Sequence, residues 1–564
     1  MSLSKPPSST EDEKKDDTRA YIDAASIHEG KKEGVLRYSS TSAAHRKFEP
    51  YHVNLIALGG TVGTSLFIYM GSGLTQGGPA NLLMGYAFWT SVIWSVAEIQ
   101  KEMVTVWPTD CAFSRNAGRY VDDAMGFAMA WNFFISQIAL VLFEVVAFGV
   151  VIGYWDAASN VNIAVYITIV IALYCALNLW DARFYANAEF AAAMGKVLLI
   201  IGLLLFTFIS MVGGNPQHKV FGFTYWNNPG AMTTPYPSHE PTLGRFEGFF
   251  ACVINACFTI AGPDYLSMVA GEARHPRKTM PKAFDQTIYR LVFFYFGSAI
   301  AIGILCPYND PNLLGAIAAG APGAATSPYV IAMQRMSIPA LPSIVNALIL
   351  SSVLSAGNAF VFCSSRSLAM MARDGQAPKI FSKRNKRGVP YLAVSLCLAI
   401  ALLSYLQVSS SASVFITYLT GLVGSAQLVT WFGMSFTWIR WNAAYKAQGI
   451  SRETLPVRSR VAPYCAWYAF ICVIIVTTLQ GYPVFLEGKW DVSTFIFSYA
   501  MPILFPIFFL FWKLVKRTKW ETSLSADITS FVDDPEFTEI QHYEDEETRG
   551  AVSAFSHKVL STLF

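Results

Sequence analysis

The amino-acid sequence predicts an all-α integral membrane protein with twelve transmembrane helices. Three observations indicate this fold class. Hydrophobic residues make up 53% of the 564 residues and charged residues only 14%, whereas about a quarter of the residues of a soluble domain are charged. The apolar residues occur in blocks of about 20 residues or more, which is long enough for a helix to cross a bilayer. The basic residues are distributed unevenly between the connections of these blocks.

The apolar blocks define the twelve spans in chain order. The predicted spans are residues 52–74, 79–100, 125–154, 161–180, 188–213, 248–270, 287–306, 341–369, 391–408, 413–439, 465–485 and 492–515. Residues 1–48 and 519–564 are polar and show no helical pattern, so we expect two disordered tails around one membrane domain, residues 49–518. Two longer connections, 214–247 and 307–340, are rich in Pro, Gly and Asn.

The basic residues predict the orientation in the membrane. Nineteen Lys and Arg residues lie in connections that follow even-numbered spans, and four lie in connections that follow odd-numbered spans. Because cytoplasmic connections are enriched in these residues, we expect both tails to be cytoplasmic. This topology fits a transporter or a channel and also a membrane enzyme, so the chemistry of the spans has to decide between them.

The first span contains the glycine-rich segment GGTVGTS in the middle of an apolar run. Glycine loses about 1 kcal/mol relative to alanine in a helix, so three glycines in a turn and a half need a reason. Two interpretations are open. Gly59 and Gly63 form a small-xxx-small face that lets another helix approach closely. Alternatively, the helix unwinds near the bilayer midplane at Gly63, Thr64 and Ser65, and its freed N–H groups bind an anionic group such as a carboxylate.

The sixth span contains a second irregular segment, FTIAGPD. Pro263 removes an N–H and opposes the carbonyl four residues back, and Gly262 loosens the same turn. Two interruptions five spans apart are what an inverted repeat of five plus five helices produces. The break would free the carbonyls of Phe258, Thr259 and Ala261, which can accept hydrogen bonds from an ammonium group.

The segments GGTVGTSLF and FTIAGPDYLSMVAGEARHPRKTMPKAF resemble the first-span and sixth-span signatures of fungal amino-acid permeases. The segments YWNNPGA, SAGNAFVFCSSRSLAMMARDGQAPKIF, RGVP and AAYKAQGI continue the match in order, which covers about residues 48–519. These permeases belong to the amino acid–polyamine–organocation superfamily. The resemblance implies twelve helices, of which the first ten form a LeuT-like five-plus-five inverted repeat with discontinuous helices 1 and 6.

Two positions depart from the family signatures. Ser65 replaces the third glycine of the first-span motif, and Asp264, preceded by proline, replaces the glutamate of the sixth-span motif. The segments GPDY, KEMVTVWPTDCAF and RYVDDAMGF resemble a broad-range branch that includes members linked to carnitine and polyamine uptake. The resemblance therefore implies transport of amino acids, with carnitine or polyamines as alternative substrates.

Ionisable residues inside the spans are candidate functional residues, because a charge there costs at least a few kcal/mol. Lys196 in the fifth span either snorkels toward the cytoplasmic end or couples transport to protons, and its match to the family's fifth-span lysine favours coupling. Glu144 in the third span binds the substrate's ammonium group, relays a proton, or makes a structural hydrogen bond to a neighbouring helix. Asp264 either caps the broken helix or takes part in gating or proton transfer.

Small polar residues complete the predicted site. Ser355 and Asn358 in the eighth span either link helices or act beside Lys196. Thr420 and Gly421 in the tenth span match a region that shapes side-chain selectivity in the family. The predicted site residues are Gly63, Thr64, Ser65, Phe258, Thr259, Ala261, Glu144 and Thr420 for substrate binding, and Lys196, Asp264 and Ser355 for proton coupling.

The leading hypothesis is uptake of amino acids across the plasma membrane by proton symport and alternating access. The alternative is a non-transporting nutrient sensor or regulator on the same fold, although tails of about 48 and 46 residues are short for a signalling domain. We find no His cluster, Ser/His/Asp order or P-loop, so the sequence argues against an enzyme. The basic residues fit the topology, so nucleic-acid binding has no support.

The expected partners are the lipid bilayer, the substrate and the coupling proton. The nine cysteines are scattered and show no metal-binding spacing, so we expect no metal and no cofactor. Lys14, Lys15, Lys31 and Lys32 in the N-terminal tail are candidate sites for ubiquitin attachment by the endocytic machinery, and the competing interpretation is a solvated, disordered tail.

Overall fold

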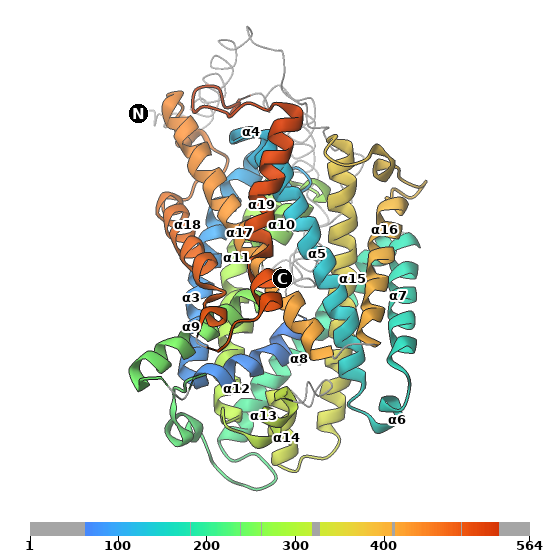
Figure 1. Cartoon of the computed structure of the whole chain (residues 1–564), viewed down its shortest axis with the longest axis vertical. Helices are drawn as coiled ribbons and strands as arrows, with labels where there is room; N and C mark the ends of the chain where they lie inside the picture. Colours follow the sequence, from blue (N-terminus) through green and yellow to red (C-terminus); the bar gives the residue numbers. More distant parts are fainter. Residues whose placement is uncertain are drawn as a thin grey trace, which may run out of the picture.

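The structure of the protein is a computed structural model. The residues that it describes are 53, 63–180, 182–236, 239–260, 262–318, 327–408, 412–486 and 488–529. Ala261, the N-terminal lysines and the glycines before Gly63 lie outside the described residues. Throughout these ranges the chain forms helices and their connections, without any strand, and the prediction of an all-α protein is confirmed (Figure 1).

The longer helices follow the predicted spans in order, but not one to one: the first of them contains the end of the first span and the whole of the second, and two successive helices form the seventh. They are α3 (Met70–Val106), α5 (Asp123–Ile152), α7 (Ile163–Trp180), α8 (Ala182–Met211), α9 (Pro241–Thr259), α11 (Pro276–Arg290), α12 (Gly297–Leu305), α15 (Leu341–Arg373), α16 (Tyr391–Ala401), α17 (Ala412–Ala447), α18 (Ala462–Leu479) and α19 (Val492–Lys516).

Short helical segments join or extend these helices. They are η2 (Ser65–Tyr69), α4 (Ala112–Tyr120), α6 (Asp156–Ser159), η3 (Trp226–Gly230), α10 (Pro263–Val269), η4 (Ala270–Glu272), η5 (Leu291–Phe296), α13 (Pro311–Ala318), α14 (Pro328–Arg335), η7 (Lys379–Ser382), η8 (Leu402–Val408), η9 (Arg452–Thr454) and η10 (Tyr482–Phe485). The two longer connections, 214–247 and 307–340, therefore contain η3, α13 and α14.

Nine helical runs in the described part of the chain are long and apolar enough to cross a membrane. The first of them, Ser65–Val106, has 42 residues and is bent at Gly78, so it contains parts of the first two predicted spans. Two further apolar helices, Ile163–Leu179 and Tyr391–Gln407, are shorter and coincide with the fourth and ninth predicted spans.

The bend at Gly78 requires glycine. Its φ of 79° lies in the left-handed region, and a Cβ there would approach the carbonyl oxygen of Ala231 to 2.9 Å. The N–H of Ala80 donates to the same carbonyl at 2.8 Å, and the N–H of Thr233 donates to the carbonyl of Gly77 at 3.0 Å. The connection between α8 and α9 is thereby fixed to the turn between the first two spans.

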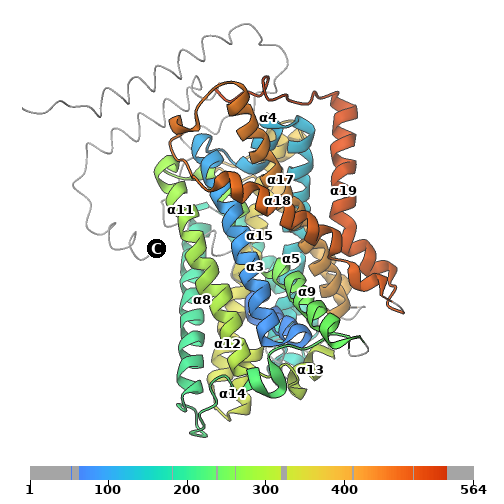
Figure 2. The ribbon, with the colours of Figure 1, turned by 90° about the vertical axis from the view of Figure 1, so that its left-hand side faces the viewer.

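The helices pack around α5, which lies between α15 and α17, while α3 packs along α9. The last helix, α19, packs against α17 and α5, and α8 packs against α12 (Figure 2). The sixth span is interrupted within this bundle, because α9 ends at Thr259 and α10 begins at Pro263. Ile260 between them has an extended backbone, with φ −96° and ψ 133°. The predicted break of the sixth span is therefore present.

Buried ion pairs gather at the end of the bundle that contains α4. Arg115 on α4 donates two hydrogen bonds to Asp374, at 2.9 and 2.8 Å, and both side chains are 1% exposed. Arg373 donates to Asp110 at 2.7 Å. Burial raises the pKa of Asp110, but the positive charges of Arg373 and Arg115 outweigh burial, and the net shift of this pKa is downward. These pairs join α4 and the connection before it to the end of α15.

The chain after α19 crosses the same end of the bundle. We call residues 518–529 the C-terminal strap. Its Asp527 accepts a hydrogen bond from Arg119 at 2.9 Å, and the N–H of its Glu521 donates to the carbonyl of Val121 at 2.9 Å. Gln448, directly after α17, donates to the carbonyl of Ala526 at 2.7 Å. The strap thus links the α4–α5 turn to the end of α17.

We predict that Arg115→Met destabilises the protein strongly, because it leaves Asp374 buried without its cation. Breaking a buried ion pair in this way costs about 3–5 kcal/mol. The control is Arg458→Met, which removes an equally short pair with Glu453 whose side chains are 41% and 73% exposed, and exposed pairs contribute about 0–1 kcal/mol. Thermal unfolding in detergent measures both variants. Equal midpoints for the two would contradict the structural role of the Arg115–Asp374 pair.

Candidate functional site

A buried cavity lies where the first and sixth spans meet α5, α15 and α17. Its volume is about 20 Å³, enough for about one water molecule, so an amino acid enters only if the lining side chains move. The lining residues are Gly63 and Ser65 of the first span, Leu140, Phe143 and Glu144 of α5, Phe258 and Thr259 of α9, Tyr265 of α10, Phe360 of α15, and Gln427 of α17.

Glu144 connects α5 to the first span inside this cavity. Its carboxylate accepts a hydrogen bond of 2.5 Å from the Thr64 hydroxyl, and its side chain is almost fully buried. A Cβ on Gly63 would lie 2.9 Å from the Glu144 carboxylate and 3.0 Å from the Cβ of Ala356. The absence of a side chain at Gly63 therefore lets α5 and α15 approach the first span closely.

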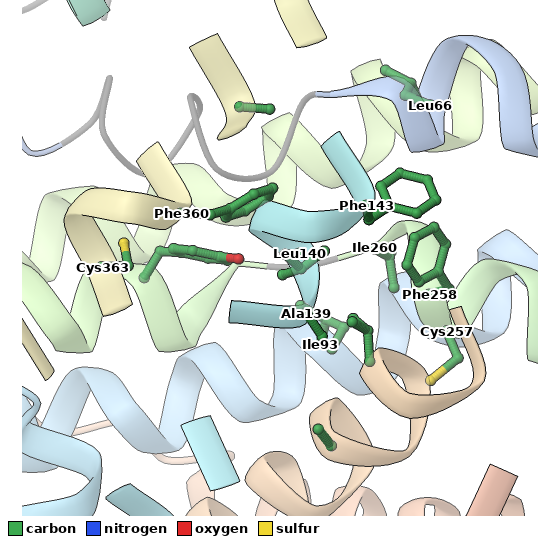
Figure 3. Packing of buried hydrophobic residues seen from close by; sticks show 14 of the residues in the cluster. Leu66, Ile93, Ala139, Leu140, Phe143, Cys257, Phe258, Ile260, Phe360 and Cys363 are labelled. Atoms are coloured by element: carbon green, nitrogen blue, oxygen red, sulfur yellow. The ribbon is translucent and has the colours of Figure 1, made fainter. Parts of the chain in front are cut away.

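Aromatic rings form one wall of the cavity. The ring of Phe258 lies 5.0 Å from the rings of both Tyr69 and Phe143, edge to face in each case. Figure 3 shows the rings of Phe143 and Phe258 side by side, with Ile260 of the non-helical link nearby. Such contacts contribute packing energy beyond the area that they bury, about 0.5–1.5 kcal/mol for each pair. They hold the end of α9 in place where its helical hydrogen bonding stops.

Lys196 lies outside the cavity lining, within a second buried polar cluster. The cluster contains Glu189, seven residues earlier on α8, whose carboxylate accepts a 2.7 Å hydrogen bond from Ser355. The Lys196 side chain is 2% exposed, and its charge interacts with those of Glu189 and Glu144. The predicted neighbourhood of Lys196 and Ser355 is thus supported, but through Glu189, which the sequence analysis did not select.

Asp264 lies just beyond the break in the sixth span. Its carboxylate accepts a hydrogen bond from the N–H of Gly262 at 3.4 Å, and its side chain is buried. A carboxylate in the first turn of a helix also interacts favourably with the helix dipole. The geometry therefore favours the interpretation that Asp264 caps α10, and it shows no contact of Asp264 with the cavity.

The predicted binding residues separate into three groups. Five of them line the cavity, namely Gly63, Ser65, Glu144, Phe258 and Thr259. Thr64 and Thr420 are buried beside it, and the Thr420 hydroxyl donates within its own helix to the carbonyl of Thr417. Ala261 lies outside the described residues.

Sequence reasoning missed Tyr265, Phe360 and Gln427, which line the cavity from three helices far apart in the chain. No local pattern marks them, because their proximity arises only when α10, α15 and α17 pack together. Glu189 did leave a signal: it precedes Lys196 by seven residues, so the two side chains share one face of α8.

These features define a class of protein. A bundle of membrane-length helices encloses a cavity at a broken helix, and buried carboxylates and a buried lysine lie beside it. Interrupted helices at a central site are typical of secondary transporters. The comparison with known families agrees with this class, because the amino acid permease family matches residues 52–524. The protein belongs to this family.

Similar proteins include the general amino acid permease AGP2 of Saccharomyces cerevisiae, which is 37% identical over 92% of this chain and 86% of that protein. The proline-specific permease of Emericella nidulans is 36% identical over 86% of this chain and 88% of that protein. The dicarboxylic amino acid permease of S. cerevisiae is 34% identical over 94% of this chain and 85% of that protein. Relatives of nearly equal identity thus carry different substrate names, and overall identity does not determine the substrate.

Among solved structures, the chain is similar to Mhp1, a nucleobase-cation-symport-1 family transporter in a closed conformation with bromovinylhydantoin bound. The sequence identity is 14%, the TM-score is 0.45, and the match covers 85% of this chain and 95% of Mhp1.

We predict that Gly63→Ala lowers amino-acid uptake by about tenfold. The added methyl group overlaps the Glu144 carboxylate and Ala356, and overpacking of this kind costs about 1–3 kcal/mol. Uptake of a labelled amino acid, normalised to the protein at the cell surface, measures the effect. Gly202→Ala in α8 is the control, because a Cβ there meets nothing within 4 Å. Wild-type uptake by Gly63→Ala would show that the first span does not need this close approach.

Proposed function

We propose that the protein is a secondary transporter that takes up amino acids by proton symport and alternating access. The main chain of the substrate binds between the first span and the interrupted sixth span, its carboxylate at Gly63, Thr64 and Ser65 and its ammonium group at the end of α9. The observation that carries this proposal is the hydrogen bond between Glu144 and Thr64, which places a carboxylate at the point where the substrate carboxylate is expected.

This arrangement supports coupling between substrate and proton. Two carboxylates that share one site repel each other, and the repulsion decreases when one of them is protonated or moves away. A substrate carboxylate that approaches Thr64 therefore favours a protonated Glu144 or a Glu144 that turns toward the charge of Lys196. In either case substrate binding and proton binding assist each other, which is what symport requires.

The polar cluster around Lys196 supplies ionisable side chains that can bind and release the coupling proton. Lys196, Glu189 and Glu144 are buried and interact electrostatically, so the gain or loss of one proton changes the balance among all three. Ser355 and Asn358 hold the Glu189 carboxylate by hydrogen bonds. We infer that Lys196 and Glu189 exchange a proton with Glu144 during the transport cycle and that Ser355 positions Glu189.

The excess of Lys and Arg after even-numbered spans supports an orientation with both tails in the cytoplasm. The ion pairs of Arg115 and Arg373 and the C-terminal strap then lie on the cytoplasmic side. We place the protein in the plasma membrane, where such uptake occurs, with ubiquitin attachment at the N-terminal lysines as a route to its removal.

The first test is uptake of radiolabelled amino acids at pH 5 and pH 7.5 by cells without their own permeases. Proton symport predicts accumulation that is higher at pH 5 and is abolished by a protonophore. Competition by carnitine and polyamines against the same labelled substrate tests the alternative substrates. Ligand-dependent signalling without accumulation at either pH would instead identify a sensor and reject transport.

The second test uses Glu144→Gln, which preserves the size of the side chain but removes its titration. We expect uptake that no longer varies with pH, so that the ratio of rates at pH 5 and pH 7.5 falls to near one, and we expect the same loss for Lys196→Ala. Glu240→Gln is the control, because this glutamate is exposed before α9 and caps no N–H. A variant of Lys196 or Glu144 with the wild-type pH profile would exclude that residue from coupling.

A further inference from the structure

The polar groups that face the cavity differ in whether they already have a partner. The Thr259 hydroxyl lies 2.5 Å from the hydroxyl of Tyr86, and the Tyr265 hydroxyl accepts a hydrogen bond from Gln137. The side-chain amide oxygen of Gln427 is buried and has no hydrogen-bond partner among the described residues, and the whole residue is only 6% exposed. A buried polar atom without a partner costs free energy, so it calls for a ligand.

The backbone that carries Gln427 is held on two sides. Asn132 on α5 donates hydrogen bonds to the carbonyl of Ala426 and the hydroxyl of Thr430, each at 2.9 Å. The thiol of Cys257 on α9 contacts the carbonyl of Gly424 at 3.8 Å. These contacts flank Gln427 in the sequence, so α17 presents the amide to the cavity from a fixed position.

The rest of the lining limits the kind of side chain that fits. Leu140, Phe143, Phe258 and Phe360 are apolar, no Lys, Arg or His is among the lining residues, and the one carboxylate, Glu144, is bonded to Thr64. An acidic side chain would find no cation there. The amide of Gln427 offers both a donor and an acceptor, and the groups that match both are a carboxamide or a hydroxyl.

We propose that Gln427 selects the substrate side chain, and that the cavity takes neutral amino acids with a carboxamide or hydroxyl group in preference to apolar ones of similar size. The inference rests on the proposed function, in which the first span and the broken sixth span bind the main chain of the substrate. Gln427 then pairs with the side chain, and this pairing distinguishes one zwitterion from another.

The test compares Gln427→Met, which keeps the length of the side chain but removes the amide, with the wild-type full-length protein in whole-cell uptake. Glutamine and methionine serve as one substrate pair of similar size, and asparagine and leucine as a second. A site that hydrogen-bonds its substrate rejects an analogue without that group, so we expect the wild type to prefer the amide by about tenfold or more. In Gln427→Met the preference should disappear or reverse.

The control is Ser425→Ala, two residues away on α17, whose hydroxyl donates to the carbonyl of Leu422 within the same helix and does not line the cavity. It should keep the wild-type ratio. Gln427→Glu is a second variant for the case in which Gln427→Met does not reach the membrane. Its charge should favour lysine over glutamine by about tenfold.

The outcomes separate the two proposals. A wild type that takes up no amino acid rejects the proposed function itself. Uptake with the same amide preference in wild type, Gln427→Met and Gln427→Glu rejects only the role of Gln427. A wild type that prefers methionine or leucine, or that takes up glutamate best, also overturns the inference, because the cavity would then recognise a group that its lining does not match.

Discussion

The structure depends on one constraint: a helix that stops inside a membrane must find partners for its main-chain N–H and C=O groups within the protein. The sixth span stops between Thr259 and Pro263, in the middle of the bundle. On the α10 side of this break, the main-chain donors are accounted for, because Asp264 accepts a hydrogen bond from the N–H of Gly262 and Pro263 has no N–H. At the other side of the break, Phe258 and Thr259 at the end of α9 line the cavity, and the proposed function assigns the ammonium group of the substrate to this end.

The buried charged residues form two groups with different roles, one near the cavity and one at the end of the bundle near α4. Near the cavity, Glu144 on one span and Glu189 and Lys196 on another balance one another, so their interactions can change as the two spans move. At the end of the bundle near α4, Arg115 and Asp374 form a pair with two hydrogen bonds that ties α4 to the end of α15. A bidentate pair resists displacement more than a single contact does. The cluster near the cavity therefore suits a part of the protein that moves, and the Arg115–Asp374 pair suits a part that stays rigid.

Much of the fold follows from local sequence, and much of the site does not. The spans follow from hydropathy, and the break at Gly262 and Pro263 follows from residues that are poor helix formers. Gly63 and Glu144 also carry local signals, since glycine and a carboxylate are unusual inside an apolar span. Tyr265 and Phe360 carry none, because aromatic residues are common in any span. They become site residues only through the packing of helices that are distant in the chain.

The attachment of the C-terminal strap has a practical consequence for handling the protein. Residues 518–529 form part of the folded body, with Ile528 1% exposed and Gln448 bonded to main-chain carbonyls of the strap. A fluorescent reporter or purification tag joined after Thr529 preserves these bonds. Trimming the gene at the end of the last membrane helix would instead uncover apolar side chains of α4 and α17, such as Tyr120, Trp441 and Tyr445, which share a buried cluster with Ile528.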